Sequence, residues 1–175
     1  PPSEPKTKLF DLYQLGNHRL FCGDATNLSD VEKLMNGEKA AMIFTDPPYN
    51  IDYEGKTKNR LKIQNDSLGE GFFEFLKTSF SNYWAICRPG ASMYVCHADT
   101  ERVNFTKAFL DSGFHLSSVI VWVKNNATFG RQDYFWKHEP ILYGWRNDGA
   151  HNWYGPNNEV SVWEIDRPLR SEEHP

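Results

Sequence analysis

The tetrapeptide Asp46-Pro47-Pro48-Tyr49 constrains the fold most strongly, because it follows directly on the apolar run 41–45. That run predicts a short buried strand, and a residue before proline favours extended backbone, so Asp46 stays in line with the strand. Neither proline has an N–H to donate, so the turn offers the Asp46 carboxylate, fixed carbonyl groups and the Tyr49 ring. This combination predicts a pocket for a planar ring that carries an exocyclic amino group.

The predicted pocket also suits a particular chemistry. An aromatic amine is a poor nucleophile, because its lone pair is delocalised into the ring. If the Asp46 carboxylate and the Pro47 carbonyl accept the two amine hydrogens, the nitrogen can pyramidalise and present its lone pair to an electrophile. Tyr49 is then placed to stack on a flipped-out base. The alternative is a strand that ends in a proline turn beside an ordinary surface tyrosine.

Hydrophobic periodicity predicts strands that alternate with helices along the chain. The expected strands are 19–23, 41–45, 92–96, 116–123 and 140–145. The expected helices are 28–35, one capped by Asp66 or Ser67, and one capped by Asp99 or Thr100 that ends at Gly113. This order is typical of an α/β fold with helices on both faces of the sheet and a final antiparallel hairpin. Ligands bind at the carboxyl ends of strands in such sheets, so we expect one rim to gather Asp24, Asp46, His97 and Lys124.

Length and composition bound the remaining possibilities. With 175 residues and 39% hydrophobic content, we expect one domain over 9–175, preceded by a flexible proline-rich arm over 1–8. No apolar stretch is long enough to span a membrane and no leader is evident, so we expect a cytoplasmic protein without a membrane partner. The three cysteines lack Cys-x-x-Cys spacing and the six histidines lack ligand spacing, so we expect no metal site.

The net charge of −4 argues mildly against a nucleic-acid partner, but the distribution of charge matters more. The stretch 55–65 contains no acid, and its cations are Lys56, Lys58, Arg60 and Lys62. A basic loop just after Asp46 would track the phosphate backbone of double-stranded DNA. The alternative is a solvated surface loop without a partner.

Six segments in order carry a resemblance to a known family. They are 15–26, 45–53, 94–99, 121–124, 130–134 with 138–144, and 162–163. Together they resemble the S-adenosylmethionine-dependent DNA amino-methyltransferases that act on adenine N6 or cytosine N4. The branch that is similar is circularly permuted and carries its Asp-Pro-Pro-Tyr motif near the N-terminus. The resemblance implies a Rossmann-like methyltransferase sheet.

The resemblance also implies roles for particular residues. Asp46, Pro47, Pro48 and Tyr49 match the catalytic motif. Asp24 and Ala25 match a segment that meets the adenosine part of S-adenosylmethionine, with Asp46 beside the same cofactor. Tyr134 falls where the family stacks an aromatic ring on the target base, and 146–167 is a short candidate for target recognition.

One family feature is absent from the sequence. The family binds the methionine part of its cofactor with an apolar strand and a Phe-x-Gly-x-Gly loop, whereas Gly69-Glu70-Gly71 follows Asp66-Ser67-Leu68. The resemblance therefore implies a fragment with an incomplete sheet, which lacks the strands of the cofactor loop. Its expected partner is the missing C-terminal cofactor-binding half or a second copy of the chain.

We therefore expect an adenine-N6 DNA methyltransferase of the restriction-modification kind. The alternatives are a cytosine-N4 enzyme, an RNA substrate, or a non-catalytic binding module that has lost its cofactor.

Overall fold

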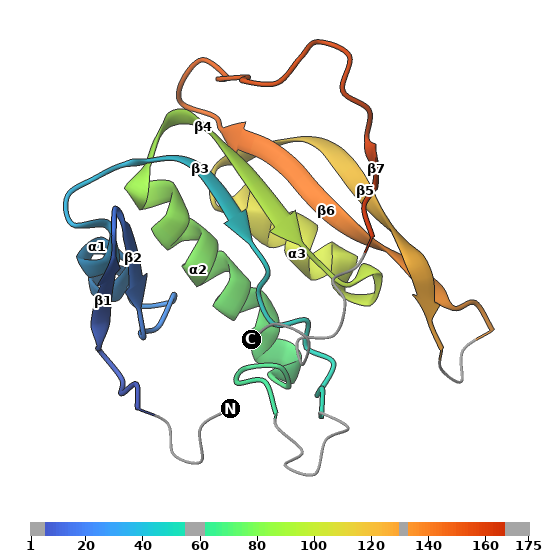
Figure 1. Cartoon of the computed structure of the whole chain (residues 1–175), viewed down its shortest axis with the longest axis horizontal. Helices are drawn as coiled ribbons and strands as arrows, with labels where there is room; N and C mark the ends of the chain where they lie inside the picture. The colour runs from blue at the N-terminus through green and yellow to red at the C-terminus, as the bar shows by residue number, and fades with distance from the viewer. Residues whose placement is uncertain (1–5, 55–61, 130–132, 167–175) are drawn as a thin grey trace.

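The computed structural model describes residues 6–54, 62–129 and 133–166, and a five-stranded mixed sheet lies at its centre (Figure 1). The spatial order of the strands is β3-β4-β6-β5-β7. Their bounds are β3 Ala40–Thr45, β4 Cys87–Cys96, β5 Phe114–Thr128, β6 Trp136–Arg146 and β7 Val162–Glu164. β3 runs parallel to β4, whereas β6 is antiparallel to both β4 and β5. The predicted antiparallel hairpin is therefore confirmed as β5 and β6.

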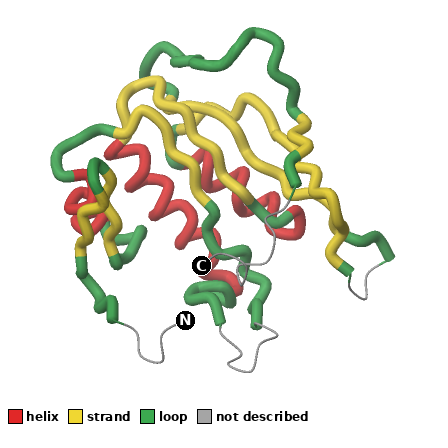
Figure 2. Tube along the Cα trace, viewed as in Figure 1, coloured by secondary structure: helices red, strands yellow, loops and turns green. Residues whose placement is uncertain are grey.

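Helices α2 (Phe72–Ile86) and α3 (Arg102–Asp111) lie together on one face of this sheet (Figure 2). Side chains alternate between faces along a strand, so Met93 and Val95 of β4 point into the core beneath the helices. The core also contains Phe72, Leu76, Phe80, Phe105, Ala108, Phe109, Phe114 and Leu142. This arrangement confirms the α/β class.

The opposite face of the sheet differs from the expectation of helices on both faces. In the described residues, the segment 147–161 arches beside this face and encloses a hollow of about 360 Å³ with the sheet. Trp163 of β7 and Tyr143 of β6 line the hollow. Ile43 of the edge strand β3 packs against the core, so Met42 and Phe44 point to the opposite face, where they are 56% and 55% exposed, and the predicted buried strand is in fact half exposed.

The first strands form a separate unit beside helix α1 (Leu28–Met35), which has the predicted bounds. β1 (Leu12–Leu15) pairs antiparallel with β2 (His18–Phe21) in a two-stranded sheet. The prediction of a strand over 19–23 missed its partner. Leu15 pairs with His18, so Gly16 and Asn17 form a two-residue hairpin turn, and Gly16 adopts the positive φ (62°) that such turns need.

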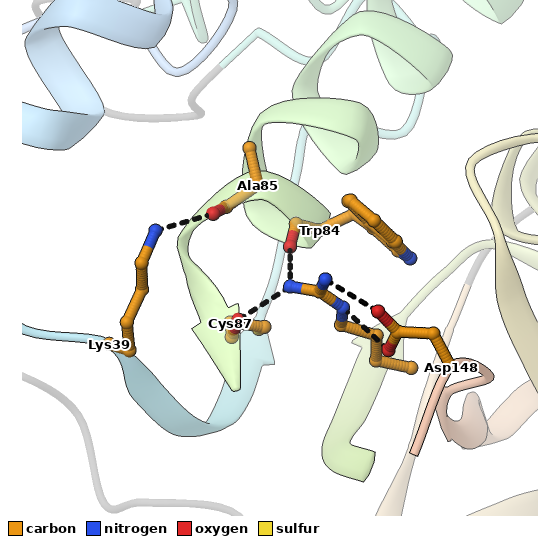
Figure 3. Close-up of polar contacts among 6 residues, drawn as sticks. Lys39, Trp84, Ala85, Cys87 and Asp148 are labelled. Carbon is orange, nitrogen blue, oxygen red and sulfur yellow. Dashed lines mark hydrogen bonds and ion pairs between the residues drawn. The ribbon is translucent and has the colours of Figure 1, made fainter. Parts of the chain in front are cut away.

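A pair of cations fixes the C-terminal end of α2 to the sheet (Figure 3). Arg146 Nη1 donates hydrogen bonds to the carbonyls of Trp84 (2.9 Å) and Cys87 (2.6 Å), and Lys39 Nζ donates to that of Ala85 (2.8 Å). The Arg146 guanidinium also lies 3.6 Å from the centre of the Trp84 ring and is paired with Asp148. Positive side chains thus satisfy helix-end carbonyls and complement the helix dipole.

Candidate active site

The Asp46 turn lies at the carboxyl end of β3, where the sheet pairing of β3 with β4 ends at Thr45 and Val95. A hollow of about 300 Å³ opens beside it. The residues that line this hollow are Asp46, Pro47, Pro48, Tyr49, Ile51, Tyr53, Ile63 and Asp66. An exposed carboxylate, a rigid turn and aromatic walls therefore meet at one end of the sheet.

Tyr49 holds one oxygen of the Asp46 carboxylate. Its hydroxyl donates a hydrogen bond to Asp46 Oδ1 at 2.7 Å. Burial, and then the bond to Asp46, raise the pKa of Tyr49, so the hydroxyl stays a neutral donor. The Tyr49 ring packs edge-on against Phe105, with ring centres 6.3 Å apart. Tyr49 thus joins the site to the core, and within the described residues Asp46 Oδ2 has no hydrogen-bond partner.

Asp66 ties down the loop that follows the turn, and it is only 3% exposed. Its Oδ1 accepts from the Tyr49 N–H (2.8 Å) and its Oδ2 from the Tyr53 N–H (2.7 Å). The Asp66 carbonyl accepts from the Asp52 N–H at 2.7 Å. The prediction that Asp66 or Ser67 caps a helix is therefore wrong. A 3₁₀ turn, η1 (Gly69–Gly71), precedes α2, and the carboxylate of Asp66 points back to the site loop.

Asn50, in the site loop, accepts hydrogen bonds from backbone N–H groups that follow Asp66 in the sequence. Its Oδ1 accepts from the N–H groups of Leu68 (2.8 Å) and Gly69 (3.1 Å), at the start of η1. Its Nδ2 donates to Glu101 Oε1 at 3.1 Å, next to α3. Asn50 has a left-handed φ of 59°, a conformation that asparagine tolerates better than most residues. The sequence reasoning missed both Asn50 and Asp66, and their only local signal was a run of Asn and Asp residues around the motif.

His97 leaves β4 at the same rim, but it is fully buried. Its Nδ1 lies 3.1 Å from the Ala98 carbonyl, so Nδ1 carries the proton and Nε2 is an acceptor. Burial lowers the pKa of His97, so the ring is neutral at pH 7. Its ring packs against Phe105, with centres 5.5 Å apart, which makes it a packing residue between site and core.

The ends of β5 and β6 add charge to the rim. Lys124 of β5 forms an ion pair with Glu139 of β6. Burial raises the pKa of Cys96 to about 12, with contributions from Asp46 and Glu139, which Lys124 opposes. Thr45 pairs with Val95, Cys96 with Ile141, and Val123 with His138. This register places Asp46, Cys96, Lys124 and Glu139 at one end of the sheet, as expected for Asp46 and Lys124.

Asp24, which was also expected at this rim, and its neighbour Ala25 make their hydrogen bonds elsewhere. Asp24 Oδ1 accepts hydrogen bonds from the N–H (2.9 Å) and hydroxyl (2.8 Å) of Thr26. The Ala25 carbonyl accepts from Asn82 Nδ2 of α2 at 2.9 Å. Neither residue lines the hollow beside Asp46. Their predicted role in cofactor binding stays a prediction.

The predicted target-binding residues are dispersed. Tyr134 is 90% exposed and lies just before β6. Lys62 makes an exposed ion pair with Asp52 at 3.4 Å. Lys56, Lys58 and Arg60 lie outside the described residues. In the segment 146–167, Trp153 and Trp163 line the hollow on the sheet face, which shares no lining residue with the hollow beside Asp46.

The described ranges contain no cluster of three or more metal-ligating side chains. No helix in these ranges is long and apolar enough to cross a membrane.

Comparison with known proteins identifies the family of the chain. Residues 40–170 match the family model N6_N4_Mtase, described as DNA methylase. No curated protein sequence matches the chain.

Several solved structures share the fold. The complex of M1.HpyAVI with SAM is 18% identical, with a TM-score of 0.56 over 82% of this chain and 63% of that one. M1.HpyAVI alone is 21% identical, with a TM-score of 0.56 over 85% and 66%. TTHA0409 of Thermus thermophilus, described as a candidate DNA modification methylase, is 16% identical, with a TM-score of 0.52 over 83% and 66%. The chain thus spans slightly less than two thirds of the length of these structures.

Proposed function

The chain belongs to the DNA methylase family described by the N6_N4_Mtase model, and from this premise we propose that it is the catalytic and target-binding part of a DNA amino-methyltransferase. The observation that carries the proposal is the Asp46 turn. Its carboxylate stands at a strand end, in an open hollow, with one oxygen held by Tyr49 and the other directed to no described partner.

The turn would act on the amino group of a flipped-out base. Asp46 Oδ2 and the Pro47 carbonyl accept the two amine hydrogens, which localises the nitrogen lone pair. Tyr49 keeps the carboxylate in this orientation and offers its ring as a wall of the base pocket. A bound methyl donor would supply the methyl carbon and keep the electrons of its broken carbon–sulfur bond, and the extra proton on nitrogen would leave through Asp46 to solvent. Positioning and fixed charge supply most of the acceleration.

The rim suits S-adenosylmethionine, which supplies an electrophilic methyl group when bound. Glu139 is paired with Lys124, so the Asp46 carboxylate, which has one oxygen without a described partner, is the negative charge at the rim that would favour a nearby sulfonium cation. M1.HpyAVI, which shares the fold, was crystallised with SAM. Asp46 would hold the cofactor near its methyl group, and we propose Asp24 and Ala25 as further contacts to its adenosine part.

Adenine N6 is the proposed target atom. Tyr49, Ile51, Tyr53 and Ile63 give the hollow aromatic and aliphatic walls, which suit the larger stacking surface of a purine. Cytosine N4 presents the same two hydrogens to the same acceptors, so it is the second candidate. Mass spectrometry of digested DNA separates the two, because it resolves N6-methyladenine from N4-methylcytosine.

Double-stranded DNA is the proposed partner. Lys62 stands next to Ile63 at the hollow, and Lys56, Lys58 and Arg60 precede it in the sequence. Tyr134 is proposed to stack on or beside the target base. Binding through these cations would weaken steeply as salt increases. We also propose a role in restriction-modification, with a cytoplasmic location in a prokaryotic or phage-like setting.

The exposed edge of β3 supports a further protein partner. Met42 and Phe44 are more than half exposed on a strand that pairs only with β4 in the described residues. Such an edge favours association. We propose that a cofactor-binding part covers it, with a second copy of the chain as the alternative.

A non-catalytic binding module is the other candidate function. It is favoured by Asp24, whose side chain is engaged by Thr26 in its own turn. Isothermal titration calorimetry with S-adenosylmethionine separates the two functions, because micromolar binding by this chain excludes a module that has lost its cofactor.

A further inference from the structure

We propose that Asp66 is the positioning residue of the amine-binding turn, an inference that rests on the proposed function. Asp66 lies 17 residues after Tyr49 in the sequence, yet its carboxylate closes the loop that begins at Tyr49. It is not proposed as a catalytic residue, because both of its carboxylate oxygens already accept backbone N–H groups.

The Asp66 carboxylate fixes the geometry of the loop at both of its oxygens. The N–H groups of Tyr49 and Tyr53 converge on the two oxygens of one side chain, at 2.8 and 2.7 Å. A carboxylate is the side chain that offers acceptors on both oxygens and no donor. Asp66 is 3% exposed, so water cannot readily replace it, and its loss would leave both N–H groups without their partner.

The backbone conformation of the loop requires such hydrogen bonds. Asn50 and Asp52 adopt left-handed φ values of 59° and 49° within it. Asn and Asp adopt this conformation more readily than other non-glycine residues, but two such residues so close together still favour a loop that its surroundings hold in place. The Asp52 N–H donates to the Asp66 carbonyl at 2.7 Å, so Asp66 accepts hydrogen bonds from the backbone of Tyr49, Asp52 and Tyr53.

Tyr49 connects Asp66 to Asp46, the carboxylate that would meet the substrate. Asp66 holds the backbone of Tyr49, and the hydroxyl of Tyr49 holds Asp46 Oδ1 at 2.7 Å. A change at Asp66 therefore moves the Tyr49 backbone first and the Asp46 carboxylate next. Displacement of a reacting group by about 1 Å costs on the order of 100-fold in rate.

The matched control lies in the same loop. Asp66→Ala removes both acceptors, and Asp66→Asn retains one. Asp52→Asn makes the same change from carboxylate to amide at an exposed side chain whose described contact is Lys62, and asparagine tolerates the positive φ at this position. An exposed ion pair contributes little to stability.

The experiment has two readouts. Amide hydrogen exchange by NMR should show protected Tyr49 and Tyr53 N–H groups in the wild type, at most one of them protected in Asp66→Asn, and neither in Asp66→Ala. Exchange in α2, at Leu76 and Phe80, should remain slow in every variant. With the protein expressed from its complete reading frame, kcat for methyl transfer should fall about 100-fold in Asp66→Ala. The Kd for S-adenosylmethionine should change less than about threefold.

The possible outcomes distinguish the proposed function of the protein from the positioning role of Asp66. No methyl transfer by the wild type overturns the proposed function, and amide exchange then decides alone whether Asp66 holds the turn. An active wild type with an unchanged kcat in Asp66→Ala overturns the positioning role and leaves the proposed function standing. Faster exchange throughout α2, with loss of S-adenosylmethionine binding, assigns Asp66 a purely structural role and overturns the proposal. A response of Asp52→Asn equal to that of Asp66→Asn also overturns it.

Discussion

The hydroxyl of Tyr49 donates a 2.7 Å hydrogen bond to Asp46 Oδ1, so the aromatic ring and the carboxylate of the motif act as one unit. The ring is anchored in turn by its edge-on contact with Phe105. The tyrosine therefore orients the carboxylate in addition to lining the hollow beside it.

Substitutions at Tyr49 should separate these two contributions. Tyr49→Phe keeps the ring and its contact with Phe105, so methyl transfer should fall by about tenfold or less and stability by about 1 kcal/mol. Tyr49→Ala removes the ring as well, so the rate should fall at least about 100-fold. Single-turnover kinetics of the two variants measure the difference, and equal rates would show that the ring contributes nothing.

Buried thiols should make the protein less stable at alkaline pH. Burial raises the pKa of Cys87 to about 11 and that of Cys96 to about 12, from an ordinary value of 9.0. Both groups stay protonated in the folded protein while the unfolded chain ionises. Their contribution to stability is complete below pH 9 and is lost as the pH rises through 11 and 12. The slope approaches about 1.4 kcal/mol per pH unit for each thiol.

Urea unfolding at several pH values from about 8 to about 10.5 measures this slope. The double variant Cys87→Ala/Cys96→Ala is the control and should show a shallower dependence on pH. Equal slopes in the two proteins would contradict the assignment to the thiols.

Arg146 should be irreplaceable by lysine. Its guanidinium reaches two helix-end carbonyls and covers the Trp84 ring at the same time (Figure 3). Lysine keeps the charge but lacks the planar fork, so Arg146→Lys should lower the free energy of unfolding by about 2 kcal/mol. Lys39→Arg, at the neighbouring carbonyl of Ala85, is the control and should have little effect. Thermal denaturation of both variants tests this, and an unchanged melting temperature for Arg146→Lys contradicts it.

Local sequence patterns predicted the strand that carries Asp46 and several of the helices and strands around it. Proline after a short apolar run placed Asp46 at a strand end, and helical spacing predicted α1 and α2. The hairpin of β5 and β6 was also predicted, because two apolar runs flank a polar loop. The partner strand β1 was missed, since Leu12–Leu15 is too short to stand out from its neighbours.

Long-range contacts were beyond the reach of sequence reasoning. Asp66 looked like a helix cap, because its local neighbours resemble a helix start, but its partners lie at Tyr49 and Tyr53. Likewise, the edge position of β3 depends on which strands pair, and periodicity cannot reveal it. Asp24 follows a strand as expected, yet that strand belongs to a separate hairpin.

Methyl transfer from radiolabelled S-adenosylmethionine to unmethylated double-stranded DNA tests the central claim most directly. The assay compares the wild type with Asp46→Ala, using the protein expressed from its complete reading frame and circular dichroism to verify folding. The account predicts incorporation of label into N6-methyladenine by the wild type and a loss of at least about 1,000-fold in Asp46→Ala. An Asp46→Ala protein that methylates DNA at the wild-type rate would contradict it.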